Sequence, residues 1–464
     1  MKRILIKETI NHINKKVRLC GWVHIIRRLG KMIFVDLRDI SGMVQVVFLS
    51  DNQELLKLAK TLRPEFVVEI IGKVNQRPDK LVNSKMPTGT VEIQAQELKI
   101  LAESKTPPFE IAEEKEAGEA LRYKYRYLDL RRESNRKMII LRSKFIKFIR
   151  DFLHKEGFIE VETPILGKST PEGARDYLVP SRIYPGKFYA LPQSPQQYKQ
   201  LLMVAGLEKY FQIAPCFRDE DSRADRAPDQ FYQLDLEMSF INQEEILNLT
   251  ERLFSETIKT LFPEKKITYS PWPRLTYQEA MEKYKTDKPD LRKNKNDQNE
   301  LAFCFIIDWP LFETELEDGH LAPAHHMFTA PKDSDVPLLE YEPQKARSWQ
   351  HDLALNGYEV GGGSIRITDP KIQEKVFELV GISKEDIQSK FGHLLEAFQY
   401  GVPPHGGIAP GIDRILMILL NASNVREVTA FPKTGDNRDP MMGSPSVVDK
   451  KQLKDLHLKL DLEK

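Results

Sequence analysis

The sequence predicts an α+β protein in which a small N-terminal β-barrel precedes a larger domain built on an antiparallel sheet with flanking helices. Three observations predict this. The first hundred residues alternate short β-rich runs with turn signals. Further on, strands and helices alternate irregularly, and hairpins pair several of the strands. Between the two regions, Thr106-Pro107-Pro108 and the charged run 113–119 have the composition of a linker.

Five β-rich runs make up the N-terminal region, and one helix-like segment, Gln53–Leu62, falls between the third and the fourth. An OB-fold carries its helix at this place, so we expect a five-stranded OB-fold over residues 1–104, although other small barrels have a similar pattern. The runs are Val17–His24, Ile33–Leu37, Met43–Phe48, Phe66–Val74 and Val91–Ile93.

Residues 105–135 are expected to form a hinge or linker, and residues 136–464 the second domain. Apolar residues recur at helical spacing over Met138–Leu153, and Gly157 follows as a stop signal. The next run, Phe158–Thr163, is strand-like and is ended by Pro164. A polar tract within residues 288–300 predicts a short exposed loop.

Composition narrows the class of protein. Lys and Arg total 69 against 68 for Asp and Glu, so a nucleic-acid partner needs a local basic face. The three cysteines have no metal or redox spacing, which indicates cytosolic thiols. No apolar run reaches the roughly 18 residues of a membrane span, so we expect a soluble, cytoplasmic protein.

Two strand-like runs, Tyr210–Glu220 and Phe231–Phe240, flank a charged loop and predict an antiparallel hairpin. Because side chains alternate along a strand, Arg218 and Glu220 are expected on one face, and Asp235 on the polar face of the second strand. Ordinary surface ion pairs are the alternative for such a hairpin taken alone.

A second hairpin is predicted at Asn356-Gly357, which favours a two-residue type I′ turn. Pairing across this turn sets Asp352 opposite Gly361 and Ala354 opposite Glu359. Asp352 and Glu359 then lie diagonally on one face, which suits Mg²⁺ shared with substrate phosphates. The alternative is a repulsive carboxylate pair without a metal.

The glycine run 361–363 lets a ligand approach the backbone closely. Arg366 follows Glu359 by seven residues and falls on the opposite face of an ideal strand. Both can line one pocket only if a bulge at the glycines changes the register. Farther on, Arg414 stands at the start of an apolar helix, where a cation opposes the helix dipole and anion binding is the better explanation.

Together these segments resemble the three signature motifs of class II aminoacyl-tRNA synthetases. The resembling segments are Gly157–Pro164, Phe217–Glu220 with its return strand, and Gly407–Arg414. Further stretches narrow the resemblance to the aspartyl branch. These are Thr170–Asp176, Gln193–Gln196 with Lys199, His325-His326, Gly357–Arg366 and Ala430–Thr434.

The resemblance implies a site for ATP, with Mg²⁺ as cofactor, in which Arg218 and Arg414 are catalytic. The implied ATP-binding residues are Arg218, Asp219, Glu220, Glu359, Gly411, Ile412, Asp413 and Arg414. Asp352 and Glu359 are implied to hold Mg²⁺. The implied aspartate-binding residues are Glu172, Ser194, Gln196, Lys199, Arg218, Asp235, His325 and Arg366.

The implied activity is that of an aspartate–tRNA ligase: L-aspartate is activated with ATP to aspartyl-adenylate and transferred to the 3′ end of tRNA(Asp). A homodimer through Met138–Pro164 is implied as well. In the barrel, an exposed Phe34 flanked by basic and polar groups suits stacked single-stranded bases. The residues implied to read the anticodon are Phe34, Gln45, Arg27 and Glu92.

Three departures and alternatives accompany this interpretation. The extra domain usual in bacterial members is absent from the sequence around 288–300, and Ala227 stands where relatives have glutamine near ATP. Leu29 stands where relaxed-specificity relatives have histidine, which supports the hypothesis of charging tRNA(Asp) alone. The alternatives are an enzyme that charges both tRNA(Asp) and tRNA(Asn), an asparaginyl enzyme, and a non-catalytic RNA-binding paralogue.

Overall fold

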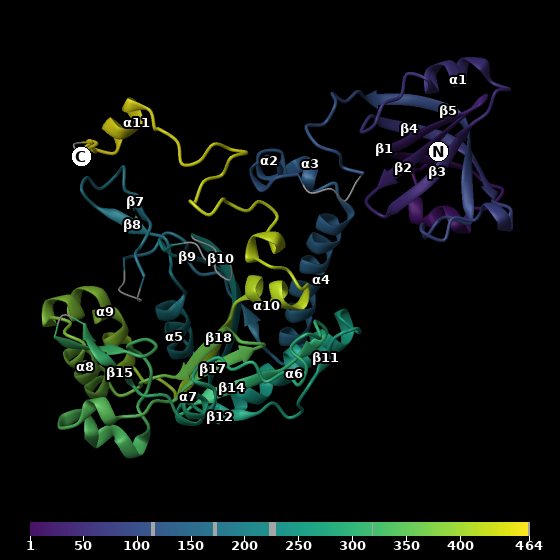
Figure 1. Cartoon of the computed structure of the whole chain (residues 1–464). Coiled ribbons are helices and arrows are strands. Elements are labelled where there is room, and N and C mark those ends of the chain that lie inside the picture. Colours follow the sequence, from purple (N-terminus) through teal and green to yellow (C-terminus); the bar gives the residue numbers. More distant parts are fainter. Residues whose placement is uncertain (113–116, 170–173, 222–228, 318, 463–464) are drawn as a thin grey trace. The chain divides into compact units, whose positions relative to one another are not determined.

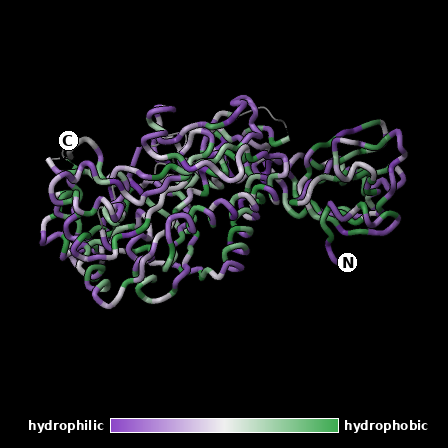
Figure 2. Tube along the Cα trace, turned by 90° about the horizontal axis from the view of Figure 1, so that it is seen from below, coloured by the Kyte–Doolittle hydropathy of each residue, from purple (hydrophilic) through white to green (hydrophobic). Residues whose placement is uncertain are grey.

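The computed structural model describes residues 1–112, 117–169, 174–221, 229–317 and 319–462 (Figure 1). The chain divides into two compact units, Met1–Arg136 and Lys137–Lys464. Hydrophobic stretches occur throughout both units (Figure 2). Among the described residues, no helix is both long and apolar enough to cross a membrane.

The first unit contains a closed five-stranded barrel with the strand order β1-β2-β3-β5-β4. The predicted OB-fold is confirmed, and its helix α1 (Gln53–Ala59) lies between the third and fourth strands. The strands are β1 (Lys16–Leu29), β2 (Met32–Asp39), β3 (Gly42–Phe48), β4 (Val67–Gln76) and β5 (Val91–Ala102). Alternate residues such as Ile33, Val35 and Leu37 fill the barrel core, because successive side chains of a strand point to opposite faces.

The outer face of β2 is less exposed than the sequence predicted. An exposed Phe34 was predicted, but its side chain is half-buried, and Arg38 is 4% exposed. Glu65 explains the burial of Arg38, because its carboxylate accepts hydrogen bonds from Arg38 and Arg131 at 2.8 Å each. A buried charge needs such a partner to offset its desolvation.

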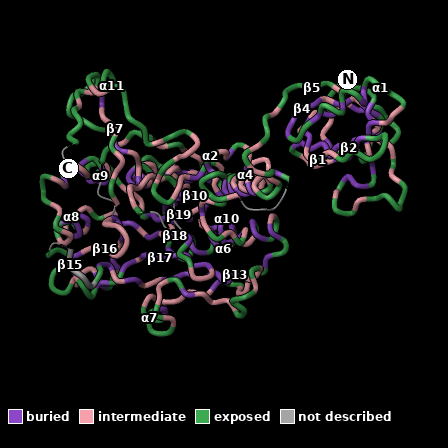
Figure 3. The backbone as a smooth tube through the Cα atoms, turned by 45° about the horizontal axis from the view of Figure 1, so that its top comes forward, coloured by how far each residue is buried: buried purple, intermediate pink, exposed green. Residues whose placement is uncertain are grey.

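The second unit is organised around an eight-stranded sheet with the order β12-β14-β17-β18-β19-β10-β9-β6. The six central strands run antiparallel, as predicted, whereas each edge strand pairs in parallel with its neighbour. The strands are β6 (Ile159–Glu160), β9 (Lys209–Phe217), β10 (Gln230–Ser239), β12 (Arg274–Thr276), β14 (Phe303–Ile307), β17 (Gln350–Leu355), β18 (Tyr358–Ile365) and β19 (His405–Pro410). The middle of this sheet is buried (Figure 3).

Helices cover the sheet and supply much of the apolar core. Met138, Phe145 and Ile149 of one helix pack into the same cluster as Leu253 of another and Leu416 of a third. The helices of this unit are α4 (Glu133–Lys155), α5 (Gln196–Val204), α6 (Gln243–Leu261), α7 (Tyr277–Tyr284), α8 (Pro370–Leu379), α9 (Lys384–Phe398), α10 (Ile412–Leu419) and α11 (Lys450–Asp455).

Smaller elements complete the described chain. The short strands are β7 (Leu178–Pro180), β8 (Phe188–Ala190), β11 (Lys266–Ile267), β13 (Glu300–Leu301), β15 (Phe312–Glu317) and β16 (His320–Pro323). The short helices are α2 (Glu119–Lys124), α3 (Arg126–Asp129), η1 (Ile6–Asn11), η2 (Asp79–Leu81), η3 (Asp333–Glu340), η4 (Pro343–Lys345) and η5 (Val425–Val428). The polar tract before β13 contains no regular element, and all three cysteines are free.

Several predicted boundaries are wrong. Helix α4 starts five residues before Met138, and the strand expected over Phe158–Thr163 shrinks to Ile159–Glu160. More important, β9 ends at Phe217, so the alternation that was to place Arg218 and Glu220 on one face does not reach them. The backbone N–H of Glu220 instead donates to the carbonyl of Arg218 at 3.0 Å, which turns the chain away from the strand.

Candidate active site

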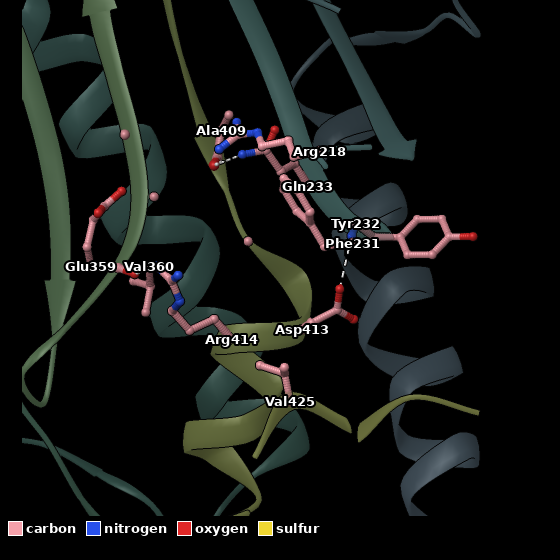
Figure 4. Close-up of a pocket in the computed structure, with 13 residues that line it drawn as sticks. Arg218, Phe231, Tyr232, Gln233, Glu359, Val360, Ala409, Asp413, Arg414 and Val425 are labelled. Carbon is pink, nitrogen blue, oxygen red and sulfur yellow. Dashed lines mark hydrogen bonds between the residues drawn. The ribbon is translucent and has the colours of Figure 1, made fainter. Parts of the chain in front are cut away.

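Two neighbouring pockets lie along the β9–β10 and β17–β18–β19 strands. They share Arg218, Gln233, Glu359, Gly362 and Ala409. The first extends toward the start of α10, as Figure 4 shows, and the second toward α5 and the histidine pair. Seven of the residues predicted to bind the substrate aspartate line the second pocket. They are Ser194, Gln196, Lys199, Arg218, Asp235, His325 and Arg366. The fold therefore brings together residues that are 172 positions apart in the sequence.

The floor of the second pocket is a buried group of four charges. Lys199 on α5 donates to Asp235 at 2.6 Å and lies 3.5 Å from Glu237. Arg366 donates to both carboxylate oxygens of Glu237, at 2.8 and 2.9 Å. All four residues are at most 3% exposed, and such pairing is what makes their burial tolerable.

The two carboxylates of the floor have pKa values shifted in opposite directions. Burial opposes ionisation of Glu237, but Arg366 and Lys199 outweigh it and lower the pKa of Glu237 to about 2. Burial raises the pKa of Asp235, and Lys199 offsets this only in part. Among the described residues, Oδ2 of Asp235 has no hydrogen-bond partner. An unmet buried acceptor in a pocket wall suits an incoming donor such as an ammonium group.

His325 and His326 follow β16 and line the same pocket. Nε2 of His326 lies 2.7 Å from Nη1 of Arg366, and because arginine can only donate, this ring nitrogen accepts. Burial, helped by Arg366, lowers the pKa of His325 to about 3. Both imidazoles are therefore neutral at pH 7.

The bulge required by the sequence is present in the β17–β18 hairpin. Ala354 pairs with Glu359 but Leu353 pairs with Gly361, so Val360 is the extra residue. As a consequence Asp352 lies opposite Gly362, and the predicted pairing with Gly361 is wrong. The extra residue changes the alternation of β18, which puts Glu359 and Arg366 on the same side of the sheet.

Gly362 is needed where the hairpin meets the histidines. A Cβ at this position would lie 3.0 Å from Cε1 of His325 and 3.1 Å from Oδ1 of Asp352, closer than ordinary packing allows. Asp352 and His325 therefore flank one small backbone opening beside the pocket. A side chain at residue 362 would close it.

Asp352 and Glu359 form a pair of carboxylates on this hairpin. Burial raises the pKa of Asp352, the negative charge of Glu359 raises it further, and two weak contacts from Gln350 oppose the shift. Two carboxylates this close repel each other when both are charged, and a divalent cation between them removes the repulsion. Among the described residues, no group of three or more His, Cys, Asp or Glu side chains could hold a metal by itself. A metal here would need ligands from a substrate.

Arg218 stands directly after β9 and lines both pockets. Its guanidinium lies over the ring of Phe231 at 5.0 Å, and its backbone N–H donates to the carbonyl of Asp229. Within the described chain, its Nε has no hydrogen-bond partner. This cation is held by stacking, which leaves its donors for an anion.

The start of α10 contributes unequally to the first pocket. Gly411, Asp413 and Arg414 line it, whereas Ile412 is buried in the core and lines neither pocket. Arg414 donates to the carbonyl of Glu359, across the pocket from Arg218. Two cations thus face one cavity from different elements.

Asp413 has another task in this structure. Its carboxylate accepts a hydrogen bond from the backbone N–H of Tyr232 at 2.9 Å and a second from Arg142 of α4. Figure 4 shows the first of these contacts. Each carboxylate oxygen accepts one of these hydrogen bonds, so Asp413 joins α10 to β10 and α4 while it also lines the first pocket.

Other predicted residues lie apart from the two pockets. Asp219 and Glu220 line neither one, and the backbone N–H of Asp219 donates to the carbonyl of Arg175 at 3.0 Å. Glu172 and Ala227 lie outside the described residues.

In the barrel, three of the four predicted RNA-contacting residues form one hydrogen-bonded line across β1, β3 and β5. Arg27 donates to Gln45 at 3.2 Å, and Gln45 donates to Glu92 at 3.0 Å. Arg27 also makes two 2.8 Å hydrogen bonds to the carboxylate of Asp36. Phe34 pairs with Arg27 in the β1–β2 ladder and lies beside this line.

Sequence reasoning missed His326 and Gln233, which line the second pocket, and Glu237, which is paired with its lining residues Lys199 and Arg366. Glu237 was available from the alternation of β10, because it shares a face with Asp235. It was passed over because an acidic side chain on a polar face reads as solvated, whereas here it is fully buried.

Comparisons with known proteins agree with this geometry. A family model described as tRNA synthetases class II (D, K and N) matches residues 118–435, and one described as an OB-fold nucleic acid binding domain matches residues 17–101. The chain belongs to the class II tRNA synthetases. Membership implies ATP, an amino acid and a tRNA as substrates.

Two relatives of this synthetase, from Rubrobacter xylanophilus and Dictyoglomus turgidum, are both named aspartate–tRNA(Asp/Asn) ligase. Each is 42% identical, and each alignment covers 97% of this chain and 96% of the relative. The first alignment spans 575 positions, so at least 111 of them have no residue in this chain of 464. These relatives therefore carry residues, about a hundred or more in total, that have no counterpart in this chain.

Solved structures show the same fold. An aspartyl-tRNA synthetase from Entamoeba histolytica matches with a TM-score of 0.74 at 24% identity, covering 95% of this chain and 93% of that one. An asparaginyl-tRNA synthetase from Pyrococcus horikoshii also matches with a TM-score of 0.74, at 25% identity, covering 94% and 98%. Because both amino-acid specificities share the fold, the pocket itself must distinguish them.

Proposed function

We propose that this synthetase activates L-aspartate with ATP and transfers it to tRNA(Asp). The floor of the second pocket carries this proposal, since Lys199 and Arg366 place two cations where the substrate side chain would lie. A carboxylate side chain gains from two cations, whereas the amide of asparagine does not. The names of the 42% identical relatives support the same amino acid.

In the proposed first step, the α-carboxylate of aspartate attacks the α-phosphorus of ATP and pyrophosphate leaves. Two anions must approach each other, so cations have to spread the developing charge. Arg218 lines both pockets and can contact the aspartate carboxylate and the α-phosphate together. Arg414, at the other end of the first pocket, is suited to the far end of the triphosphate.

We propose that Asp352 and Glu359 hold Mg²⁺ together with phosphate oxygens of ATP. The negative charge of Glu359 raises the pKa of Asp352, and a divalent cation would relieve this repulsion between the two carboxylates. When bound, the metal supplies charge neutralisation at the phosphates. The proposed contact for the substrate ammonium is Asp235, whose Oδ2 has no partner in the described chain.

In the second step the terminal ribose hydroxyl of the tRNA attacks the carbonyl carbon of the aspartyl-adenylate and loses its proton, the acyl–phosphate bond breaks, and AMP leaves. We propose that the barrel binds the anticodon through Phe34 and the line formed by Arg27, Gln45 and Glu92. A half-buried aromatic ring beside hydrogen-bonding groups suits unpaired bases. The proposed assembly is a homodimer that pairs through α4, which sedimentation analysis would test.

The tRNA range has a second candidate. Leu29 favours tRNA(Asp) alone, whereas the names of the relatives include tRNA(Asn). Charging purified tRNA(Asp) and tRNA(Asn) side by side with aspartate separates the two. Comparable rates for both tRNAs would overturn the hypothesis based on Leu29.

The central experiment is ATP–pyrophosphate exchange with aspartate and with asparagine. We expect exchange only with aspartate, and we expect Arg218→Ala to abolish it. Arg292→Ala is a matched control, because Arg292 is paired with Asp290 away from both pockets. Exchange driven by asparagine, or retained by the Arg218→Ala variant, would contradict the proposal.

A further inference from the structure

A third pocket adjoins the amino-acid pocket across helix α5. Gln196 and Lys199 line the amino-acid pocket, whereas Gln197, Tyr198 and Leu201 line the third. Helical spacing puts these two sets on different sides of the helix, so α5 is the wall between the pockets. Ser194, just before α5, lines both. The two pockets therefore meet at the N-terminal end of α5.

Gln197 gives this third pocket an unmet hydrogen-bonding group. The residue is 8% exposed, and within the described chain its Oε1 has no hydrogen-bond partner. Leaving a buried amide oxygen without a donor costs stability, so a persistent one in a pocket wall indicates a ligand that donates. Exocyclic amino groups of nucleobases are donors of this kind.

The rest of the lining suits a nucleotide as well. Tyr198 is 38% exposed and offers a ring for stacking, while Pro164 and Leu191 supply apolar walls. Lys168 lies at the rim, where its ammonium donates to the carbonyl of Ser389 and keeps two further donors. The lining thus combines a stacking face, a hydrogen-bond acceptor and a cation.

Two other polar groups line the pocket and define its charge. Asp176 accepts hydrogen bonds from Ser169 and Gln193, both at 2.6 Å, so its carboxylate is already engaged. His393 lies at the exposed rim, where partial desolvation of its ring and the charge of Lys168 lower its pKa. The neutral donors to Asp176 leave its negative charge in place, so the lining carries one carboxylate and one ammonium, and Lys168 is the group that can donate to a phosphate.

We propose that this third pocket binds an unpaired nucleotide of the tRNA 3′ end, next to the terminal nucleotide that enters the amino-acid pocket. The base stacks on Tyr198 and donates to Gln197, and its phosphate meets Lys168. This inference rests on the proposed function, because a tRNA must deliver its 3′ end to the amino-acid pocket. Ser194 lines both pockets, so the two nucleotides would lie on either side of this residue.

The test separates the two chemical steps. Tyr198→Leu keeps apolar bulk but removes the stacking face, so we expect kcat/KM for tRNA charging to fall about tenfold. ATP–pyrophosphate exchange should stay unchanged, because Tyr198 does not line the pockets for aspartate and ATP. Tyr198→Phe should retain charging. Tyr400→Leu, at a tyrosine 80% exposed and outside the three pockets, is the matched control.

A binding measurement makes the inference independent of catalysis. Affinity is compared for intact tRNA and for tRNA trimmed of its unpaired 3′ nucleotides, with the wild-type protein and with Tyr198→Leu and Gln197→Met. Trimming should weaken binding to the wild type several-fold and should change binding to both variants much less. Equal loss in all three proteins, or unchanged charging by the variants, overturns the inference. Failure of the wild type to charge tRNA would instead count against the proposed function.

Discussion

The floor of the amino-acid pocket and the hydrogen-bonded line on the barrel use the same residue types in opposite surroundings. In the floor, Lys199, Asp235, Glu237 and Arg366 are at most 3% exposed. On the barrel, Arg27 is 42% exposed at its side chain although it too makes a two-pronged contact with a carboxylate. Solvent screens the second pair and leaves the first at full strength. Equivalent substitutions should therefore have very different costs.

The largest effect is expected from Glu237→Ala. It leaves Arg366 and Lys199 without their shared carboxylate in a buried site, which should destabilise the protein by about 3–5 kcal/mol and abolish aspartate-dependent exchange. Denaturant unfolding and exchange measure the two losses. Glu97→Ala breaks the exposed pair with Lys16 and should cost less than about 1 kcal/mol. A similar loss of stability in both variants would contradict the predicted difference between buried and exposed charge pairs.

The next effect concerns Asp352→Asn and its dependence on pH. The folded pKa of Asp352 lies above its unfolded value, so its ionisation opposes folding, and stability falls as pH rises from the unfolded pKa through the folded one. Without Mg²⁺, Asp352→Asn should remove this loss and be more stable than the wild type above that window. Each unit of pKa elevation corresponds to about 1.4 kcal/mol.

The same variant should have a higher Mg²⁺ requirement in exchange, because the metal loses one proposed ligand. Thermal unfolding from pH 4 to 8, with and without Mg²⁺, checks the stability prediction. Parallel pH curves for variant and wild type in metal-free buffer would show that Asp352 does not carry this effect.

A smaller and more selective effect is expected from Phe34→Leu on the barrel. Loss of the stacking ring should lower kcat/KM for tRNA charging about tenfold and leave exchange unchanged, since the aspartate and ATP pockets belong to the other unit. Steady-state charging kinetics measure it. An equal loss of exchange would mean that the substitution acts through folding.

The smallest effect is expected from Arg27→Lys. The charge is kept but the two-pronged contact with Asp36 is lost, and at an exposed site this should cost less than about 1 kcal/mol. Charging should fall two- to five-fold at low salt, and the difference should shrink at high salt because the barrel site is screened. If the loss of charging does not depend on salt, the contact made by Arg27 is not screened by solvent. The predicted difference between Arg27 and the buried Arg366 would then be wrong.

Part of the site follows from local patterns, as the β17–β18 hairpin illustrates. Asn356-Gly357 specifies the turn. Glu359 and Arg366 are seven residues apart and would lie on opposite faces of an ideal strand, so one extra residue between them is needed to bring them to the same face. The bulge was predicted at the glycines, and it lies just before them, at Val360. Strand pairing with β19 places it, because Gly361 must stack closely on Pro410, where a side chain at residue 361 would clash.

The β9–β10 hairpin shows that the alternation of side chains predicts faces only within the observed strands. The alternation of β10 correctly separates Leu234 and Leu236 from Asp235 and Glu237. Alternation fails for Glu220 because β9 ends at Phe217, and a strand's end depends on its hydrogen-bonding partners. Asp413 was assigned to ATP by resemblance, yet α4 and β10 occupy its carboxylate.

The sequence by itself determined the α+β class and the five-stranded barrel, since period and turn chemistry are properties of neighbouring residues. The resemblance of its motifs to a known family implied the family and the pocket cations. Only the tertiary structure decided that Glu237 is a buried partner of Arg366, that Asp352 faces Gly362, and that α5 separates two pockets. These facts depend on distances between segments far apart in the chain. Burial then sets the strength of each charge, and no local pattern encodes burial.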